Sequence, residues 1–398
     1  MKMQRLISLG LWLSPFVVLP QMDTRTPKEF FVLAICLALS LLAVYRGEIK
    51  AFTNKWALLL MGWFIVNIVQ APTFEVTLFQ ENASNFWVWK PFLFGLVYLF
   101  AIIAISSMKV TAKDWTKILK AFIYPALIMS VYCIFQWFGL DQWFGVTESA
   151  IIHGVTNPHV AGTMGQPTIV APFIAMCVPF ALYGRKYLIA LIMIIAVCMT
   201  KSMVSIGSLV LTLIVFLSFF RMRKFCLVGI IVLGLTLGCA INSTTRGTAI
   251  NKIIKESSGR FEVYPKILKD FNSPIIGGHK KFVFTGLGAG SFKYVFAPRH
   301  AKTGYRQAHN EYLEVLYNFG FVGVFLFFAS IYYFIKRAIP KALEFGGDRI
   351  ITILCSLFCI SICAGGTFVW QIGTTAFYTV VLVGLLHNNA FLQGETDE

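Results

Sequence analysis

A histidine and an asparagine, followed at fixed spacing by two glycines, are the residues of this chain best suited to chemistry. His309 and Asn310 come directly before an apolar run that contains Gly320 and Gly323. An imidazole titrates near neutral pH and accepts a proton from a hydroxyl group, so His309 is a candidate general base. The alternative is that His309 is a packing residue at the membrane interface, and this is the interpretation we favour when the histidine is considered alone. A continuous helix would place on one face His309, Leu313, Leu316, Gly320 and Gly323. The glycines would then lie roughly 16 Å beyond the histidine, too far to join its chemistry, and would admit a neighbouring helix or a lipid chain.

The segment before this histidine, residues 242–308, is strongly basic. It has twelve basic residues against three acidic ones, a formal charge of +9. Such an excess asks for an anionic partner: a phosphorylated lipid, a pyrophosphate or an acidic glycan. A solvated basic surface near anionic lipid is the alternative. The basic residues are Arg246, Lys252, Lys255, Arg260, Lys266, Lys269, Lys280, Lys281, Lys293, Arg299, Lys302 and Arg306.

The run from Gly286 to Gly290 reads Gly-x-Gly-x-Gly and resembles a phosphate-cradling loop, although a tight turn explains the same pattern. The hydrophilic segments contain neither a DxD nor an HExxH motif. We therefore expect no catalytic metal and no cofactor, and Arg and Lys remain as the groups that would stabilise a phosphate leaving group.

Two further groups lie inside apolar runs. Cys355, Cys359 and Cys363 follow one another at four-residue spacing, which suggests either a metal or redox site or, as we favour, small buried packing residues. Lys90 lies among tryptophans in an apolar run. It is either a functional intramembrane cation or a side chain that reaches the membrane surface from a helix end.

The elements that position these residues are predicted to be transmembrane helices. Hydrophobic residues make up 57% of the 398 residues and charged residues 13%, whereas soluble domains are about 25% charged. We predict an all-α, polytopic membrane protein with about twelve spans. The start of the chain resembles a signal peptide without a cleavage site, so we read it as the first span. The apolar runs lie at 6–20, 30–45, 56–71, 86–106, 120–140, 167–184, 187–200, 203–220, 225–241, 310–335, 350–366 and 372–390.

Basic residues in the short connections predict the orientation. One alternate set of connections carries eighteen and the other carries three, so the first set is expected in the cytoplasm together with both termini. The chain then divides into spans one to nine (1–241), a large periplasmic loop (242–308), and spans ten to twelve with a short tail (309–398). Nucleic acid is not an expected partner of a loop on that side.

These residues together resemble the O-antigen ligases, within a group that also holds O-antigen polymerases and protein O-oligosaccharyltransferases. His-Asn, nine residues and Gly-x-x-Gly match that family's pattern without a gap. The run from Ser258 to Glu262 and the glycines of 286–290 are similar to the rest of its loop, and Gly162-Thr163 with Pro167 is similar to its approach to the sixth span. The family commonly has Thr-x-Ser-Arg between spans seven and eight, where this chain has Thr200-Lys201-Ser202-Met203.

The resemblance implies a GT-C-like fold and an inverting, metal-independent glycosyltransferase of the bacterial inner membrane that acts on the periplasmic face. The donor would be an undecaprenyl-pyrophosphate-linked O-antigen and the acceptor a hydroxyl of the lipid A-core, with membrane lipid around both. His309 would be the base, and substrate would contact Arg260, Lys201, Lys90, Asn310, Arg306 and Arg246. A polymerase or a protein O-oligosaccharyltransferase are the alternatives within the group. The short tail disfavours the latter, and the nine-to-three division of spans disfavours a transporter.

Overall fold

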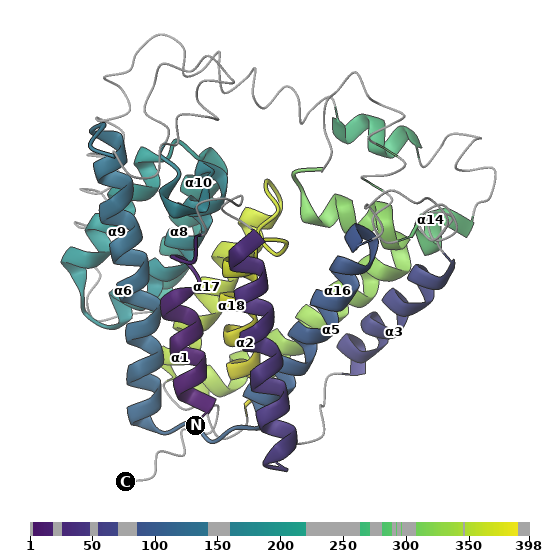
Figure 1. Ribbon diagram of the computed structural model, residues 1–398, viewed down its shortest axis with the longest axis horizontal. Helices are drawn as coiled ribbons and strands as arrows, with labels where there is room; N and C mark the ends of the chain where they lie inside the picture. The colour runs from purple at the N-terminus through teal and green to yellow at the C-terminus, as the bar shows by residue number, and fades with distance from the viewer. Residues whose placement is uncertain are drawn as a thin grey trace. The chain divides into compact units, whose positions relative to one another are not determined.

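The described part of the chain is helical throughout. The computed structural model describes residues 3–18, 26–47, 55–70, 86–141, 160–219, 263–270, 281–288, 292, 296, 308–344 and 347–388. Within these ranges the chain forms helices and turns and no β-strand (Figure 1). The predicted all-α class is therefore confirmed for the described residues.

Eleven of the twelve predicted spans overlap described helices, because each is a run of apolar residues with good helix formers. The tenth, 310–335, is not a single helix, since it is interrupted at Gly320. The remaining predicted span, 225–241, lies outside the described residues. The helices are α1 (Met3–Leu13), α2 (Thr26–Tyr45), α3 (Lys55–Gln70), α5 (Phe86–Ser107), α6 (Ala112–Trp137), α8 (Pro167–Tyr183), α9 (Tyr187–Met199), α10 (Met203–Phe219), α16 (Glu311–Glu344), α17 (Asp348–Ala364) and α18 (Gly373–His387).

Three described helical segments have the length and apolar composition to cross a membrane: Thr26–Tyr45, Ala112–Trp137 and Glu311–Pro340, the last of which is interrupted at Gly320. Five shorter apolar helices accompany them, over Phe94–Ser107, Pro167–Tyr183, Tyr187–Met199, Met203–Phe219 and Gly373–His387. The set is that of a membrane protein, with several helices shorter than the roughly 20 residues that a straight crossing needs.

The chain divides into two compact units. The first unit holds Met1–Lys50, Phe100–Arg246 and Ala338–Glu398, and the second holds Ala51–Leu99 and Gly247–Arg337. Helix α8 is the centre of the first unit: every residue from 169 to 182 is buried, and α6, α9, α10 and α17 pack around it. A helix that is apolar on all sides can be buried in this way.

A buried lysine joins three elements of the first unit. Lys28, in the first turn of α2, is 1% exposed. Its ammonium donates to the carbonyl of Val17, just past α1, at 2.9 Å and to the carbonyl of Thr163 at 2.8 Å. Thr163 belongs to the short 3-10 helix η1 (Gly162–Met164) before α8, and its hydroxyl donates to the carbonyl of Pro15. The carbonyls of Val17 and Thr163 accept two hydrogen bonds from a cation that would otherwise be costly to bury.

Candidate active site

His309 occupies an unusual backbone conformation directly before α16. Its φ is 52°, and within the described residues only Arg185 and Lys201 share a positive φ among non-glycines. Asn310 then caps the helix, because its side-chain oxygen accepts from the amide of Leu313 at 3.1 Å. An asparagine is among the best residues for this role. The histidine is thus half-buried on a left-handed turn whose next residue starts a helix.

The basic segment before His309 folds onto the start of α16 through a small apolar core. The buried members are Val263, Ile267, Leu287, Phe292, Phe296, Ala308 and Tyr317, with Tyr264 and Leu313 packed against them. The rings of Phe292 and Phe296 stack at 4.5 Å between centroids. Because Ala308 is in this core and Asn310 caps the helix, both neighbours of His309 are anchored.

Helix α16 is broken at Gly320. This residue has φ 64° and ψ −170°, a combination open to glycine and strained for other residues. The carbonyl groups of the three preceding residues find donors outside the helix. Leu287 donates to Tyr317 at 3.1 Å, Gly288 donates to Asn318 at 2.9 Å, and the Trp63 indole donates to Phe319 at 3.0 Å.

Glycine is needed on both sides of this junction. A Cβ at Gly320 would overlap the carbonyl of Phe284 in α14 (Lys281–Thr285), and a Cβ at Gly286 would overlap the carbonyl of Asn318. The Asn318 side chain adds a second link, since its Oδ1 accepts from the amide of Phe292 at 3.2 Å. The glycine run and the helix break therefore fit together as one backbone junction.

For the described part of the glycine run, this junction favours the tight-turn interpretation. The amides of Leu287 and Gly288, which a phosphate cradle would use, already donate to carbonyls of α16. The described part of the run, 286–288, is a turn that packs against α16. The absence of a side chain at Gly320 leaves room for the backbone of this segment.

The shared helical face expected from His309 to Gly323 is wrong. His309 precedes the helix, and the break at Gly320 ends the register, so that Tyr312 lies beside Phe328 with ring centroids 5.7 Å apart. Residues sixteen positions apart would be about 24 Å apart in a straight helix. Helix α16 therefore reverses on itself at Gly320.

Lys201 lies in the tight turn between α9 and α10 of the first unit, with φ 57°. The turn is held locally: the Thr200 hydroxyl donates to the Val197 carbonyl at 2.7 Å and accepts from the Ser202 amide at 3.2 Å. The Lys201 ammonium lies 5.0 Å from the centroid of the Trp137 ring, at the end of α6. A cation over an indole face is held electrostatically, so the Lys201 ammonium is held at a defined place.

A glutamine fixes the backbone next to this turn. Gln136, which is buried, accepts from the amides of Ala161 at 3.0 Å and Gly162 at 2.7 Å, and donates to the carboxylate of Asp141 at 3.0 Å. It thereby ties the end of α6 to the segment that precedes α8. The resemblance at Gly162-Thr163 therefore falls on a packed junction, where a Cβ at Gly162 would meet Val170 at 2.9 Å.

The remaining predicted site residues are placed less fully. Arg246, Arg260 and Arg306 lie outside the described residues. Lys90 is the fifth residue of α5. Lys201 belongs to the first unit and His309 to the second.

The described cysteines are packing residues. Seven are free and buried, which confirms the packing interpretation of Cys355, Cys359 and Cys363. Cys359 and Cys363 also contact a serine: the Ser208 hydroxyl lies 3.3 Å and 3.0 Å from their sulfur atoms. In the described part of the chain, no three His, Cys, Asp or Glu residues gather as a metal site would require.

The sequence interpretation missed Trp137, Trp63 and Asn318. Each contacts a residue far away in the sequence, so no local pattern marks it. Asn318 had one signal: it is a polar residue in an otherwise apolar run directly before Phe-Gly.

The described residues are those of a helical membrane protein in which part of the basic segment packs on a broken helix preceded by His-Asn. Residues 188–328 match the model of the O-Antigen ligase family. The matched segment includes the Lys201 turn, the basic segment and His309. No curated protein matches the chain. The resemblance seen in the motif is confirmed, and lipid-linked polysaccharide is the general class of substrate that the family implies.

Proposed function

We propose that this chain is an O-antigen ligase. It would transfer an O-antigen glycan from undecaprenyl pyrophosphate to a hydroxyl of the lipid A-core, on the periplasmic face of the bacterial inner membrane. The observation that supports this most is the anchoring of His309. A buried alanine precedes it, a helix-capping asparagine follows it, and the basic segment packs on the same helix.

In the proposed reaction His309 removes the proton of the acceptor hydroxyl, whose oxygen attacks the anomeric carbon of the donor sugar. The bond from that carbon to the phosphate oxygen breaks, and undecaprenyl pyrophosphate leaves with inversion at the sugar. Cations must stabilise the developing negative charge. Arg260, which matches the family motif, and Lys201 are proposed for this role, with Arg246, Arg306 and Lys90 as further substrate contacts.

Asn310 is better explained as a positioning residue. Its side-chain oxygen is engaged by the Leu313 amide, so it fixes where α16 begins and where His309 stands. Direct contact of Asn310 with substrate is the alternative proposal.

The experiment is a deletion strain analysed by lipopolysaccharide gel, complemented by the purified protein with lipid-linked donor and core acceptor. A ligase predicts loss of the ladder and accumulation of lipid-linked polymer. Core with a single repeat would indicate a polymerase instead, and an unchanged ladder would reject both. The purified reaction should continue in EDTA, and strict dependence on a divalent ion would overturn the metal-independent mechanism.

Arg260→Lys separates charge from geometry. Arginine binds phosphate oxygens through two parallel hydrogen bonds and lysine does not, so transfer should fall strongly while membrane insertion is unchanged. Full activity of Arg260→Ala would remove this residue from the mechanism.

The orientation is tested separately. A periplasm-active reporter fused after Lys269 should be active and one fused after Lys341 inactive. The reverse pattern would place the basic segment in the cytoplasm.

A further inference from the structure

The start of α6, at the end of the first unit opposite to Lys201, carries a surface whose charges are not balanced locally. Lys113, Lys117 and Lys120 are all exposed and are spaced four and three residues apart, so they lie on one face of the helix. Arg5 and Lys109 are exposed as well. They lie close to one another, since the side chain of Gln4 in α1 donates to the Lys109 carbonyl at 2.7 Å.

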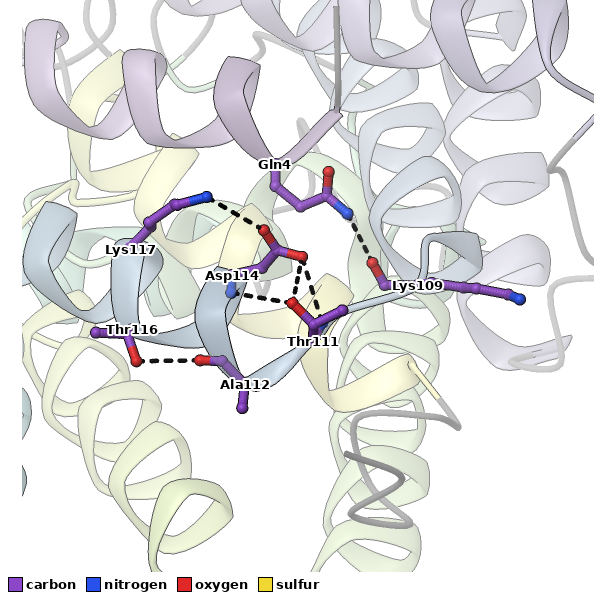
Figure 2. A network of polar contacts seen from close by, with 7 residues as sticks. All are labelled: Gln4, Lys109, Thr111, Ala112, Asp114, Thr116 and Lys117. Atoms are coloured by element: carbon purple, nitrogen blue, oxygen red, sulfur yellow. Dashed lines mark hydrogen bonds and ion pairs between the residues drawn. The ribbon is translucent and has the colours of Figure 1, made fainter. Parts of the chain in front are cut away.

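The acid within this group is already engaged, as Figure 2 shows. Asp114 forms a capping box with Thr111: its carboxylate accepts from the Thr111 hydroxyl at 2.8 Å, and its own amide donates back to that hydroxyl at 3.3 Å. The carboxylate also lies 3.8 Å from the Lys117 ammonium, which remains 61% exposed. Asp114 therefore offsets only part of the charge of the lysines.

Lys113 also opposes the helix it stands on. The first turn of a helix carries a partial positive charge and favours acidic side chains there. Lys113 is the second residue of α6. An external anion would relieve both the mutual repulsion of the lysines and the repulsion of Lys113 by the helix end.

The same face continues as an apolar surface. From Lys120, spacings of four, four, three and four residues lead along one face to Tyr124, Ile128, Val131 and Phe135. Ile128 is 47% exposed, Val131 36% and Phe135 49%. Tyr124 stands between the basic and apolar parts and stacks on Trp12 of α1, with centroids 6.1 Å apart.

We propose that this face of α6 is a binding site for an anionic glycerophospholipid. The phosphate group would lie among Lys113, Lys117 and Lys120, and an acyl chain would lie along Ile128, Val131 and Phe135. A basic head and an apolar continuation on one helix face are complementary to the two parts of such a lipid. Each lysine near an anionic membrane surface contributes about 1 kcal/mol of attraction, and the acyl contacts add apolar burial.

The test is lipid binding by the purified full-length protein, measured by native mass spectrometry with phosphatidylglycerol and phosphatidylcholine. The protein should retain phosphatidylglycerol preferentially. The triple variant Lys113→Gln, Lys117→Gln, Lys120→Gln should lose that preference by about tenfold or more. The triple Lys→Arg variant should keep it.

The matched control removes three exposed cations elsewhere, Arg185→Gln, Lys186→Gln and Lys336→Gln, and should leave the preference unchanged. Equal losses in both triple variants would mean a general charge effect and would overturn the site. Basic residues also orient membrane proteins, so the lysine variants could change the topology of the protein. A second measurement therefore uses the wild-type protein and compares soluble glycerol phosphate with the lipid. Soluble glycerol phosphate should compete poorly with the lipid, and equal competition would show that a free phosphate suffices, contrary to the proposal.

Discussion

The turn at Lys201 and the junction at His309 present a functional side chain from the same kind of backbone, a residue with positive φ, but hold it in different ways. The Lys201 turn is supported by its sequence neighbours Val197, Thr200 and Ser202, with one distant contact to Trp137. The His309 junction depends on residues of the basic segment and on a helix break eleven positions away. Local support makes a turn tolerant of change elsewhere, whereas distributed support makes the histidine sensitive to distant substitutions.

The sharpest test of this contrast is Gly320→Ala. An alanine there would be strained by its φ and would overlap Phe284, at a cost of about 3 kcal/mol or more. We expect loss of transfer and reduced thermal stability in detergent. The control Gly62→Ala in α3 meets no atom within 4 Å and should be neutral or slightly stabilising. Wild-type stability of Gly320→Ala would mean that the break is not needed.

His309→Gln tests the residue that the junction is proposed to serve. Glutamine keeps polarity and approximate size but is not a base near neutral pH. Transfer should fall on the order of 10²- to 10⁴-fold at normal protein abundance. Near-wild-type transfer with purified donor and acceptor would reduce His309 to a positioning residue.

Substitutions at Lys201 and at Trp137 should both lower transfer, and the effect at Lys201 should be the larger. Lys201→Met should lower kcat/KM about 10- to 100-fold, because hydrogen bonds to charged groups contribute about 1.5–3 kcal/mol. Trp137→Leu should lower it only about two- to fivefold through donor KM, and Trp137→Phe should restore part of the loss. An unchanged Trp137→Leu would show that the indole does not position the ammonium. A wild-type Lys201→Met would remove this turn from the mechanism.

A small effect, comparable to that of Trp137→Leu, is expected at Asn310. Loss of a helix cap costs about 1 kcal/mol, so Asn310→Ala should lower transfer about fivefold. Asn310→Ser and Asn310→Asp keep a capping oxygen and should be close to wild type. If all three variants lost activity equally, Asn310 would contact substrate in addition to capping α16.

The same contrast explains what could be predicted from the sequence. The helices of the first unit follow from long apolar runs, and α8 was expected at 167–184 and found at Pro167–Tyr183. Hydropathy depends on nearby residues, so it locates such helices well. It did not reveal the end of α1 at Leu13, where Thr163 and Lys28 bind carbonyls beyond the helix.

The break at Gly320 could not be predicted because the apolar pattern continues across it. What makes the break favourable is the glycine turn at 286–288, which supplies donors from more than thirty residues earlier in the chain. The His-Asn and Gly-x-x-Gly motif could therefore be recognised from the sequence. The role of Gly320 became clear only from its contact with the glycine turn in three dimensions. The placement of Arg260 relative to His309 lies outside the described residues, and its role stays a prediction.

The buried lysine of α2 has a consequence for biogenesis. The chain is inserted from its N-terminus, so α1 and α2 enter the membrane well before Thr163 has been synthesised. Until then the Lys28 ammonium lacks the carbonyl of Thr163 as an acceptor. An ammonium in this state is best kept hydrated at the membrane surface. The hairpin of α1 and α2 should therefore pack fully only after the segment before α8 has been inserted. Lys28 would then form its hydrogen bond to Thr163 late in assembly and fix this packing.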